Sequence, residues 1–100
     1  MTSSPAEISF SREMAYSHRD FWRTLPRAIE GQPYEIGDKA ATIGNDCRRV
    51  LIELGEEGER AIALLRIPKT EVRFRFTGYS QADVDAFMER FDLYFRKGGG

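Results

Sequence analysis

Alternation of apolar and polar residues is the strongest pattern in this chain, and it predicts antiparallel strands over residues 48–77. Three segments carry it: 48–54, 60–67 and 71–77. Between them lie Gly55–Gly58 and then Pro68–Lys69, residue types that favour turns. We therefore expect two successive hairpins here, one turning at Gly55–Gly58 and the other at Pro68–Lys69.

The N-terminal part of the chain predicts a strand followed by a helix. Residues 7–12 alternate in the same way, and Ser17 is followed three positions later by Asp20, the spacing of a helix N-cap. Pro26 lies inside the helical pattern, which reaches to Gly31. Because proline lacks the backbone N–H, we expect it to kink this helix or to split it into two short helices.

Two short strands and a longer helix complete the expected elements. The short strands cover residues 34–36 and 39–43, and the helix starts at Ser80, with Asp83 again at cap spacing. One face of this helix carries the apolar residues Val84, Phe87, Met88, Phe91, Tyr94 and Phe95. We predict an α+β fold: an antiparallel sheet of about five strands with two helices packed on one face, in the order β-α-β(4-5)-α. The domain would span residues 7–97, between a lead-in at 1–6 and a glycine tail at 98–100.

The expected hairpins assign a face to each strand residue. Pairing Leu64 with Phe74, and Ile52 with Ile62, groups the apolar residues on one face, because neighbouring side chains alternate. The predicted core face contains Val50, Ile52, Leu54, Ile62, Leu64, Val72, Phe74 and Phe76. The opposite face then holds an apolar stripe flanked by arginines: Arg49, Leu51, Ala63, Leu65, Arg73 and Arg75.

Composition narrows the class of protein. The chain has 100 residues, of which 41% are hydrophobic and 31% charged, with a formal net charge of −1; this is ordinary globular usage without the basic field of a nucleic-acid binder. The alternation over 72–76 also places phenylalanines and arginines on opposite faces, whereas a base-stacking platform needs them together. A single cysteine, Cys47, allows no internal disulfide. Because we find neither a signal-peptide pattern nor a long apolar run, we expect a cytoplasmic location.

Each match between this chain and a catalytic or metal-binding motif covers only a few residues. His18-Arg19-Asp20 matches the start of a kinase catalytic loop, but no glycine-rich phosphate loop accompanies it. Glu56, Glu57 and Glu59 cluster at the expected turn without a histidine or aspartate at metal-ligand spacing. We therefore predict no enzymatic activity, no metal site and no cofactor.

Two resemblances concern larger groups of proteins. The C-terminal Gly98-Gly99-Gly100 is similar to the Gly-Gly end of ubiquitin-like carriers, in which the terminal carboxylate is activated by adenylation, although here it follows a helix. The order of elements, including a first helix interrupted at Pro26, resembles the helix-grip fold of START-like and pollen-allergen-like proteins and the wider TATA-binding-protein-like layout. This resemblance implies that an apolar ligand could be held beneath the last helix.

The apolar stripe on the outer sheet face is the main functional candidate. Exposed apolar patches bordered by charge often mark binding surfaces, although a loop or the N-terminal segment could also cover this one. We predict an interaction module that forms a homodimer, or binds another protein, through Arg49, Leu51, Ala63, Leu65, Arg73 and Arg75. The alternative is a binder of small apolar ligands that uses Trp22, Phe74, Phe87 and Phe91. Binding of nucleic acid is the less favoured possibility, and we expect no contact with a membrane.

Overall fold

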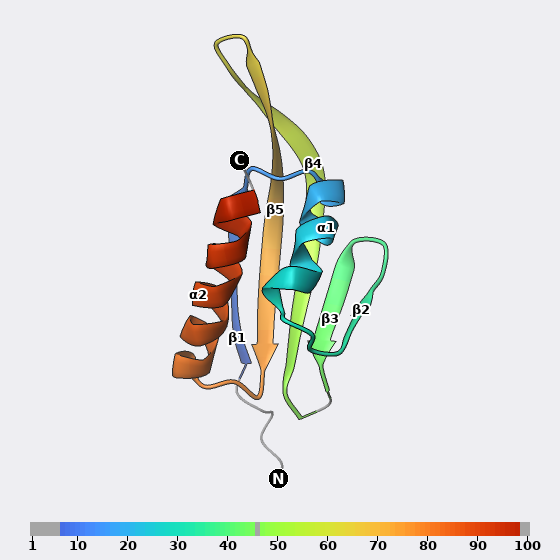
Figure 1. Cartoon of the computed structure of the whole chain (residues 1–100), viewed down its shortest axis with the longest axis vertical. Coiled ribbons are helices and arrows are strands. Elements are labelled where there is room, and N and C mark those ends of the chain that lie inside the picture. Colours follow the sequence, from blue (N-terminus) through green and yellow to red (C-terminus); the bar gives the residue numbers. More distant parts are fainter. Residues whose placement is uncertain (1–6, 46, 99–100) are drawn as a thin grey trace.

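Residues 7–45 and 47–98, which the computed structural model describes, form an antiparallel sheet with two helices (Figure 1). The five strands are β1 (Glu7–Met14), β2 (Tyr34–Ile36), β3 (Ala40–Gly44), β4 (Arg49–Ile62) and β5 (Leu65–Thr77). The helices are α1 (His18–Ala28) and α2 (Gln81–Gly98). The α+β class and the antiparallel sheet are thus confirmed. The lead-in predicted at 1–6 and the last two glycines lie outside the described residues, and Gly98 belongs to α2.

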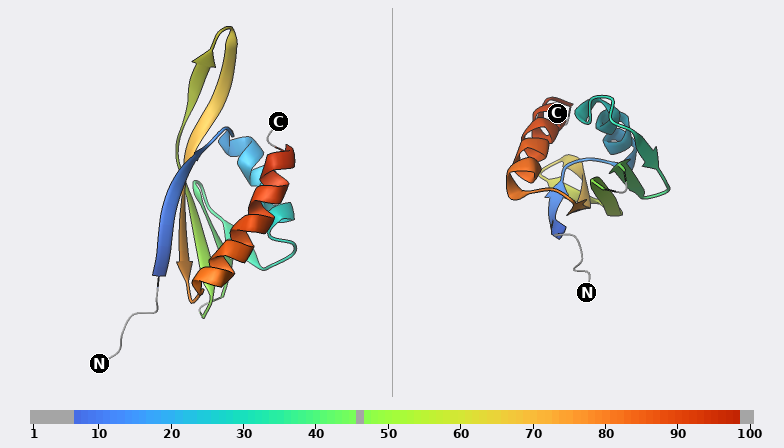
Figure 2. Two further views of the ribbon diagram at one scale, coloured as in Figure 1. Left: turned by 90° about the vertical axis from the view of Figure 1, so that its left-hand side faces the viewer. Right: turned by 90° about the horizontal axis from the view of Figure 1, so that it is seen from below.

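The sheet has the strand order β1-β5-β4-β3-β2, so the first strand lies beside the last. Both helices cover the same face of the sheet, and no helix or strand of the described residues covers the opposite face, which we call the open face (Figures 1 and 2). One edge is β1, with eight residues, and the other is β2, with three. The two strands in the middle of the sheet, β4 and β5, extend well past the ends of the helices as a long hairpin (Figure 1).

Both predicted helix caps are confirmed. The Ser17 hydroxyl accepts a hydrogen bond from the Asp20 N–H at 3.1 Å. At α2, Ser80 and Asp83 exchange side-chain and backbone bonds of 3.1 and 3.2 Å, the reciprocal arrangement of a capping box. Of the two outcomes expected at Pro26, a kink or a split, the split is wrong, since α1 is one helix and Pro26 lies in its last turn. There the missing N–H costs a single helical hydrogen bond.

The two predicted turns of the second half are wrong. β4 runs through Gly55–Gly58 and β5 runs through Pro68–Lys69, and a single turn at Ala63 and Leu64 joins them. Consequently Ile52 faces Phe74, not Ile62. A bulge between Leu54 and Glu57 shifts the register by one residue, which accommodates the glycine inside the strand.

The corrected register keeps most of the predicted core and removes two residues from it. Val50, Ile52, Leu54, Val72, Phe74 and Phe76 are buried beneath the helices. Ile62 and Leu64 are not, because both lie beyond the body of the protein. An aromatic layer fills the space under the helices: Phe91 stacks on Phe95 with ring centroids 4.0 Å apart and meets Phe74 edge-on at 5.2 Å.

Tyr16 follows the end of β1 and is hydrogen-bonded both to α2 and to β5. Its hydroxyl donates to the carbonyl oxygen of Phe95 on α2, and its own carbonyl accepts a bond of 2.7 Å from the buried Thr70 hydroxyl on β5. Burial raises the pKa of the Tyr16 phenol above its ordinary value. These bonds fix the place where β1 ends and the chain crosses to α1, and beyond that place β5 loses its β1 neighbour.

A candidate interaction arm

The far part of the β4–β5 hairpin, residues 57–69, forms an arm outside the body of the sheet. Pairing of β3 with β4 ends at Glu53, and pairing of β1 with β5 ends at Thr70. Beyond these points the two strands pair only with each other (Figure 1). Both outer edges of the arm are therefore without a neighbouring strand among the described residues. The unpaired N–H and C=O groups of such an edge can form hydrogen bonds with a strand of another chain.

The end of the arm is apolar and exposed. Leu64 is 99% exposed, Leu65 65% and Ile62 50%. Ile62 faces Leu65 across the hairpin, and Arg60 faces Ile67, so these side chains lie on one face of the arm. A single exposed leucine is common on protein surfaces, whereas several adjacent apolar side chains at a projecting tip are typical of contact surfaces.

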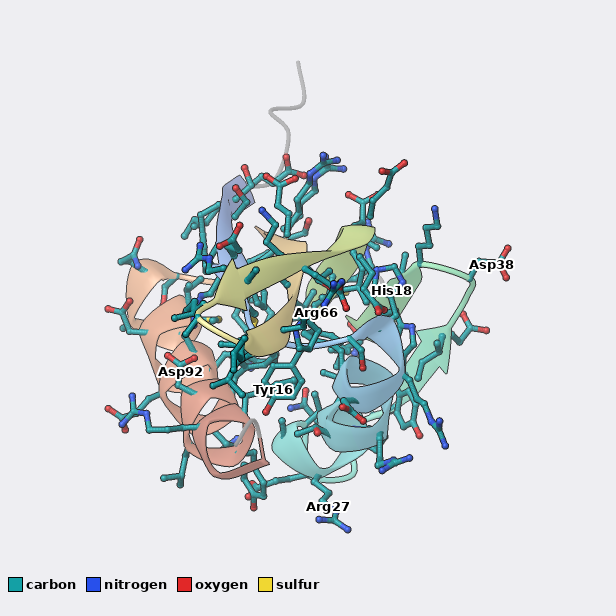
Figure 3. The ribbon with its side chains drawn as sticks, turned by 90° about the horizontal axis from the view of Figure 1, so that it is seen from above. Tyr16, His18, Arg27, Asp38, Arg66 and Asp92 are labelled. Carbon is teal, nitrogen blue, oxygen red and sulfur yellow. The ribbon has the colours of Figure 1, made fainter. Side chains whose placement is uncertain are left out.

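α1 holds the base of the arm on one side. The N–H of His18 donates to the Glu57 carboxylate at 2.8 Å, and the His18 ring nitrogen Nε2 lies 2.7 Å from the carbonyl oxygen of Gly55. A carboxylate at a helix N-terminus is favoured by the helix dipole. Figure 3, a view from above with the arm in front, shows His18 beside the arm and Tyr16 between the two helices. These contacts act at the bulge, where the arm leaves the sheet.

The end of β1 holds the arm on the other side. The Glu13 carboxylate lies 2.6 Å from the Arg60 guanidinium and 3.7 Å from the Lys69 amine. Nearer the tip, Arg66 pairs with Glu59 at 3.3 Å. All of these side chains are substantially exposed, so each pair contributes little stability. Together they compensate charge along the arm and leave its apolar residues as its distinguishing feature.

A pocket of about 200 Å³ lies where the arm meets the end of β1. Its apolar lining consists of Met14, Ala15, Ile62, Ile67 and Pro68. The charged residues that also line it are Glu13, Arg60 and Lys69, the mutually paired group described above. An apolar cavity of about 150 Å³ is enough to hold benzene, so this pocket has room for a leucine side chain.

The predicted partner-binding residues are not brought together. Arg49, Leu51, Arg73 and Arg75 lie on the open face of the sheet, with Leu51 opposite Arg75. Ala63 is in the turn and Leu65 is on the arm, ten residues along β5 from Arg75, or roughly 33 Å at the usual strand rise. The continuous apolar stripe predicted from the sequence is therefore wrong, because it depended on the turn at Gly55–Gly58.

The alternative ligand-binding residues belong to the packed interior. Phe74, Phe87 and Phe91 are buried, and Phe87 stacks on Phe91 with ring centroids 6.3 Å apart. Trp22 is half-buried on α1 and packs edge-on against Phe21 at 5.2 Å. These aromatic side chains contact one another and fill the space in which the ligand was expected.

A polar cluster occupies the opposite end of the molecule from the arm. The Arg48 guanidinium lies 4.3 Å from the centre of the Tyr79 ring and 3.5 Å from the Asp83 carboxylate. Burial raises the pKa of the Tyr79 phenol, and the Ser80 N–H lowers the pKa of Asp83. These contacts secure the start of α2.

Other candidates for chemistry give no site within residues 7–45 and 47–98. In this part of the chain no group of three or more His, Cys, Asp and Glu side chains is placed to hold a metal ion. Cys47 is exposed. No helix among the described residues is long and apolar enough to cross a membrane.

Sequence reasoning missed Met14, Ile62, Leu64 and Ile67 as surface residues of a site. A signal for the arm was nevertheless present. The apolar runs Val50-Ile52-Leu54 and Val72-Phe74-Phe76 are mirror images about position 63, as the two strands of one long hairpin must be. The turn propensity of the glycines and the proline between these two runs led instead to the prediction of two shorter hairpins.

Comparison with known proteins gave no match to a protein-family model, a curated protein or a solved structure. Function must therefore be inferred from the arm, its pocket and the rest of the fold.

Proposed function

We propose that this protein is a non-enzymatic interaction module that self-associates through the arm. The observation that carries the proposal is the cluster of Ile62, Leu64 and Leu65 at the end of a hairpin that leaves the body of the sheet. Full burial of a leucine side chain is worth about 1.5–3 kcal/mol. A second copy offers the same apolar tip, so both copies gain from one contact.

The layout of the chain supports a reduced helix-grip architecture as part of this proposal. In favour are the order β-α-β-β-β-β-α, the position of β1 beside β5 and the two helices on one face. Filling of the interior by Phe74, Phe87 and Phe91 gives no support to a ligand cavity under α2. We therefore favour self-association over ligand binding, and we retain the cytoplasmic location as a proposal.

The area of the arm limits the strength of the contact. The part of β5 that belongs to the arm, residues 65–69, is roughly 17 Å long, and a two-stranded ribbon is about 10 Å wide. The contact between two arms is then below the roughly 1,200–2,000 Å² of a stable interface. We therefore expect a weak dimer whose population depends on protein concentration.

Sedimentation equilibrium of Leu64→Glu tests this function. The substitution places a charge at a side chain that is 99% exposed, so folding should be unaffected. We expect the association constant to fall at least tenfold, because burying an unpaired carboxylate opposes the contact. Leu93→Glu is the matched control, since Leu93 is 53% exposed and belongs to α2, outside the arm. Equal masses for wild type and Leu64→Glu at high micromolar concentration would refute self-association through the arm.

A further inference from the structure

The two edges of the arm differ in the backbone groups that they present. Along an antiparallel strand, the N–H and C=O groups of successive residues point alternately to one side of the strand and to the other. The N–H of Leu54 bonds at 2.7 Å to the carbonyl oxygen of Lys39, which precedes β3, so it points away from β5. Val72, the partner of Leu54 on β5, therefore points its backbone groups away from β4. The same holds for every second residue of β5, and in the arm these are Arg66 and Pro68.

The β5 edge of the arm is poorly suited to strand pairing. Of its outward-pointing residues, Pro68 has no N–H to donate, which leaves the N–H of Arg66. β1 closes this edge at Thr70, which pairs with Met14. A proline and a short free length are among the means by which proteins prevent pairing at a sheet edge.

The β4 edge of the arm keeps its backbone donors and acceptors. Ala61 faces Arg66 across the hairpin, and Glu59 faces Pro68, so the backbone groups of Ala61 and Glu59 also point outward. Residues 57–62 contain no proline, and the pairing of β3 with β4 does not reach them. Another strand can therefore form a continuous set of hydrogen bonds at this edge.

We propose that the β4 edges of two arms pair antiparallel about a two-fold axis at Ala61. The proposal rests on the self-association proposed above and names the surface that carries it. Ala61 then lies opposite Ala61 of the second copy, and Arg60 lies opposite Ile62. Leu64, which is 99% exposed, lies opposite Gly58, whose lack of a side chain leaves room for it.

The charges on the arm select this register. An axis at Arg60 would set two arginines opposite each other, and an axis at Glu59 would do the same with two glutamates. An axis at Gly58 would set Glu57 against Glu59. The axis at Ala61 therefore gives the longest overlap of two arms in which no like charges are directly opposite.

The apolar side chains near the tip gather around the same axis. Ile62 and its cross-strand neighbour Leu65 lie on one face of the arm. Pairing about Ala61 places Ile62 of the two copies at diagonal positions on that face, roughly 7–8 Å apart. Arg60 is on this face too, but its guanidinium extends across β5 to Glu13 of β1 at 2.6 Å, away from the β4 edge. The contact therefore buries isoleucine and leucine without burying an unpaired charge.

Proline substitution tests which edge of the arm pairs. Ala61→Pro removes an outward N–H from the β4 edge, and it leaves the hydrogen bonds between β4 and β5 in place because position 61 does not contribute to them. We expect the association constant in sedimentation equilibrium to fall at least tenfold, since both hydrogen bonds between the two Ala61 residues are lost. Arg66→Pro is the matched control, because it makes the same change at the facing position of the β5 edge. It should leave the association constant nearly unchanged.

Cysteine cross-linking tests the register. Ala61→Cys and Glu59→Cys, each combined with Cys47→Ser to remove the exposed native thiol, carry a single thiol on the same edge and the same face of the arm. The Cα atoms of a hydrogen-bonded antiparallel pair are about 5.5 Å apart, within the range of about 4.4–6.8 Å that a disulfide requires. We expect Ala61→Cys to form its disulfide dimer at least tenfold faster than Glu59→Cys.

The β4 edges are not paired if Arg66→Pro weakens association as much as Ala61→Pro does. Equal cross-linking rates at positions 59 and 61 would likewise overturn the axis at Ala61. Either result would leave self-association through the arm standing, provided that Leu64→Glu still weakens it. If Leu64→Glu and wild type sediment alike, the proposed function itself fails.

Discussion

Excision of the arm is the most informative perturbation of this fold. Residues 59–68 would be replaced by Asn-Gly, a dipeptide that favours a two-residue hairpin turn. Gly58 and Lys69 face each other across the hairpin, so the new turn would close on an existing pair. The contacts of His18 with Gly55 and Glu57 would remain.

The structure indicates a small effect on stability. Excision removes the ion pair by which Arg60 joins the arm to Glu13 of the body; these side chains are 58% and 47% exposed, and such pairs contribute about 0.2–1 kcal/mol. The other ion pair that the excision removes, between Arg66 and Glu59, lies within the arm. A two-stranded hairpin alone is marginally stable at best. We therefore expect the free energy of unfolding to change by no more than about 1 kcal/mol.

Urea denaturation followed by sedimentation measures both consequences. The shortened protein should unfold with nearly the wild-type midpoint and remain monomeric at concentrations where the wild type associates. A decrease of more than about 2 kcal/mol in the free energy of unfolding would show that the arm supports the body of the sheet, and its assignment to binding would be refuted. Wild-type association in the shortened protein would refute it equally.

The remaining predictions concern the body of the protein. Phe74→Ala should lower the free energy of unfolding by about 3–5 kcal/mol in urea denaturation, because Phe74 is 1% exposed beneath Phe91. The neighbouring Arg73→Ala should change the free energy of unfolding by only about 0.5 kcal/mol. Equal losses of stability in the two variants would contradict the assignment of Phe74 and Arg73 to opposite faces of the sheet. The hydrogen bond from the Ser80 N–H lowers the pKa of Asp83 in the folded state. The stability that this bond contributes is therefore present above the ordinary carboxyl pKa, and it is lost as the pH falls through the lower pKa of the folded state. Asp83→Asn should therefore flatten the dependence of stability on pH below about pH 4, and an unchanged pH profile would count against this role.

Local sequence patterns were sufficient to predict those elements for which all the local signals favour the same structure. Ser17 and Ser80 begin helices because their hydroxyls satisfy backbone N–H groups, and this depends on residues within one turn. Alternation of Phe74 with Arg73 and Arg75 assigned their faces correctly, because one face of the sheet is buried.

The long hairpin could not be read from local signals, since these conflict with the pairing of distant residues. Gly55 and Pro68 have turn propensity, but each sits inside a strand, Gly55 at a bulge and Pro68 on the uncovered edge of β5. The actual turn uses Ala63 with a φ of 55°, a conformation that alanine adopts only at a cost. Pairing of Ile52 with Phe74 under the helices outweighs these local preferences, and the apolar tip follows from that pairing.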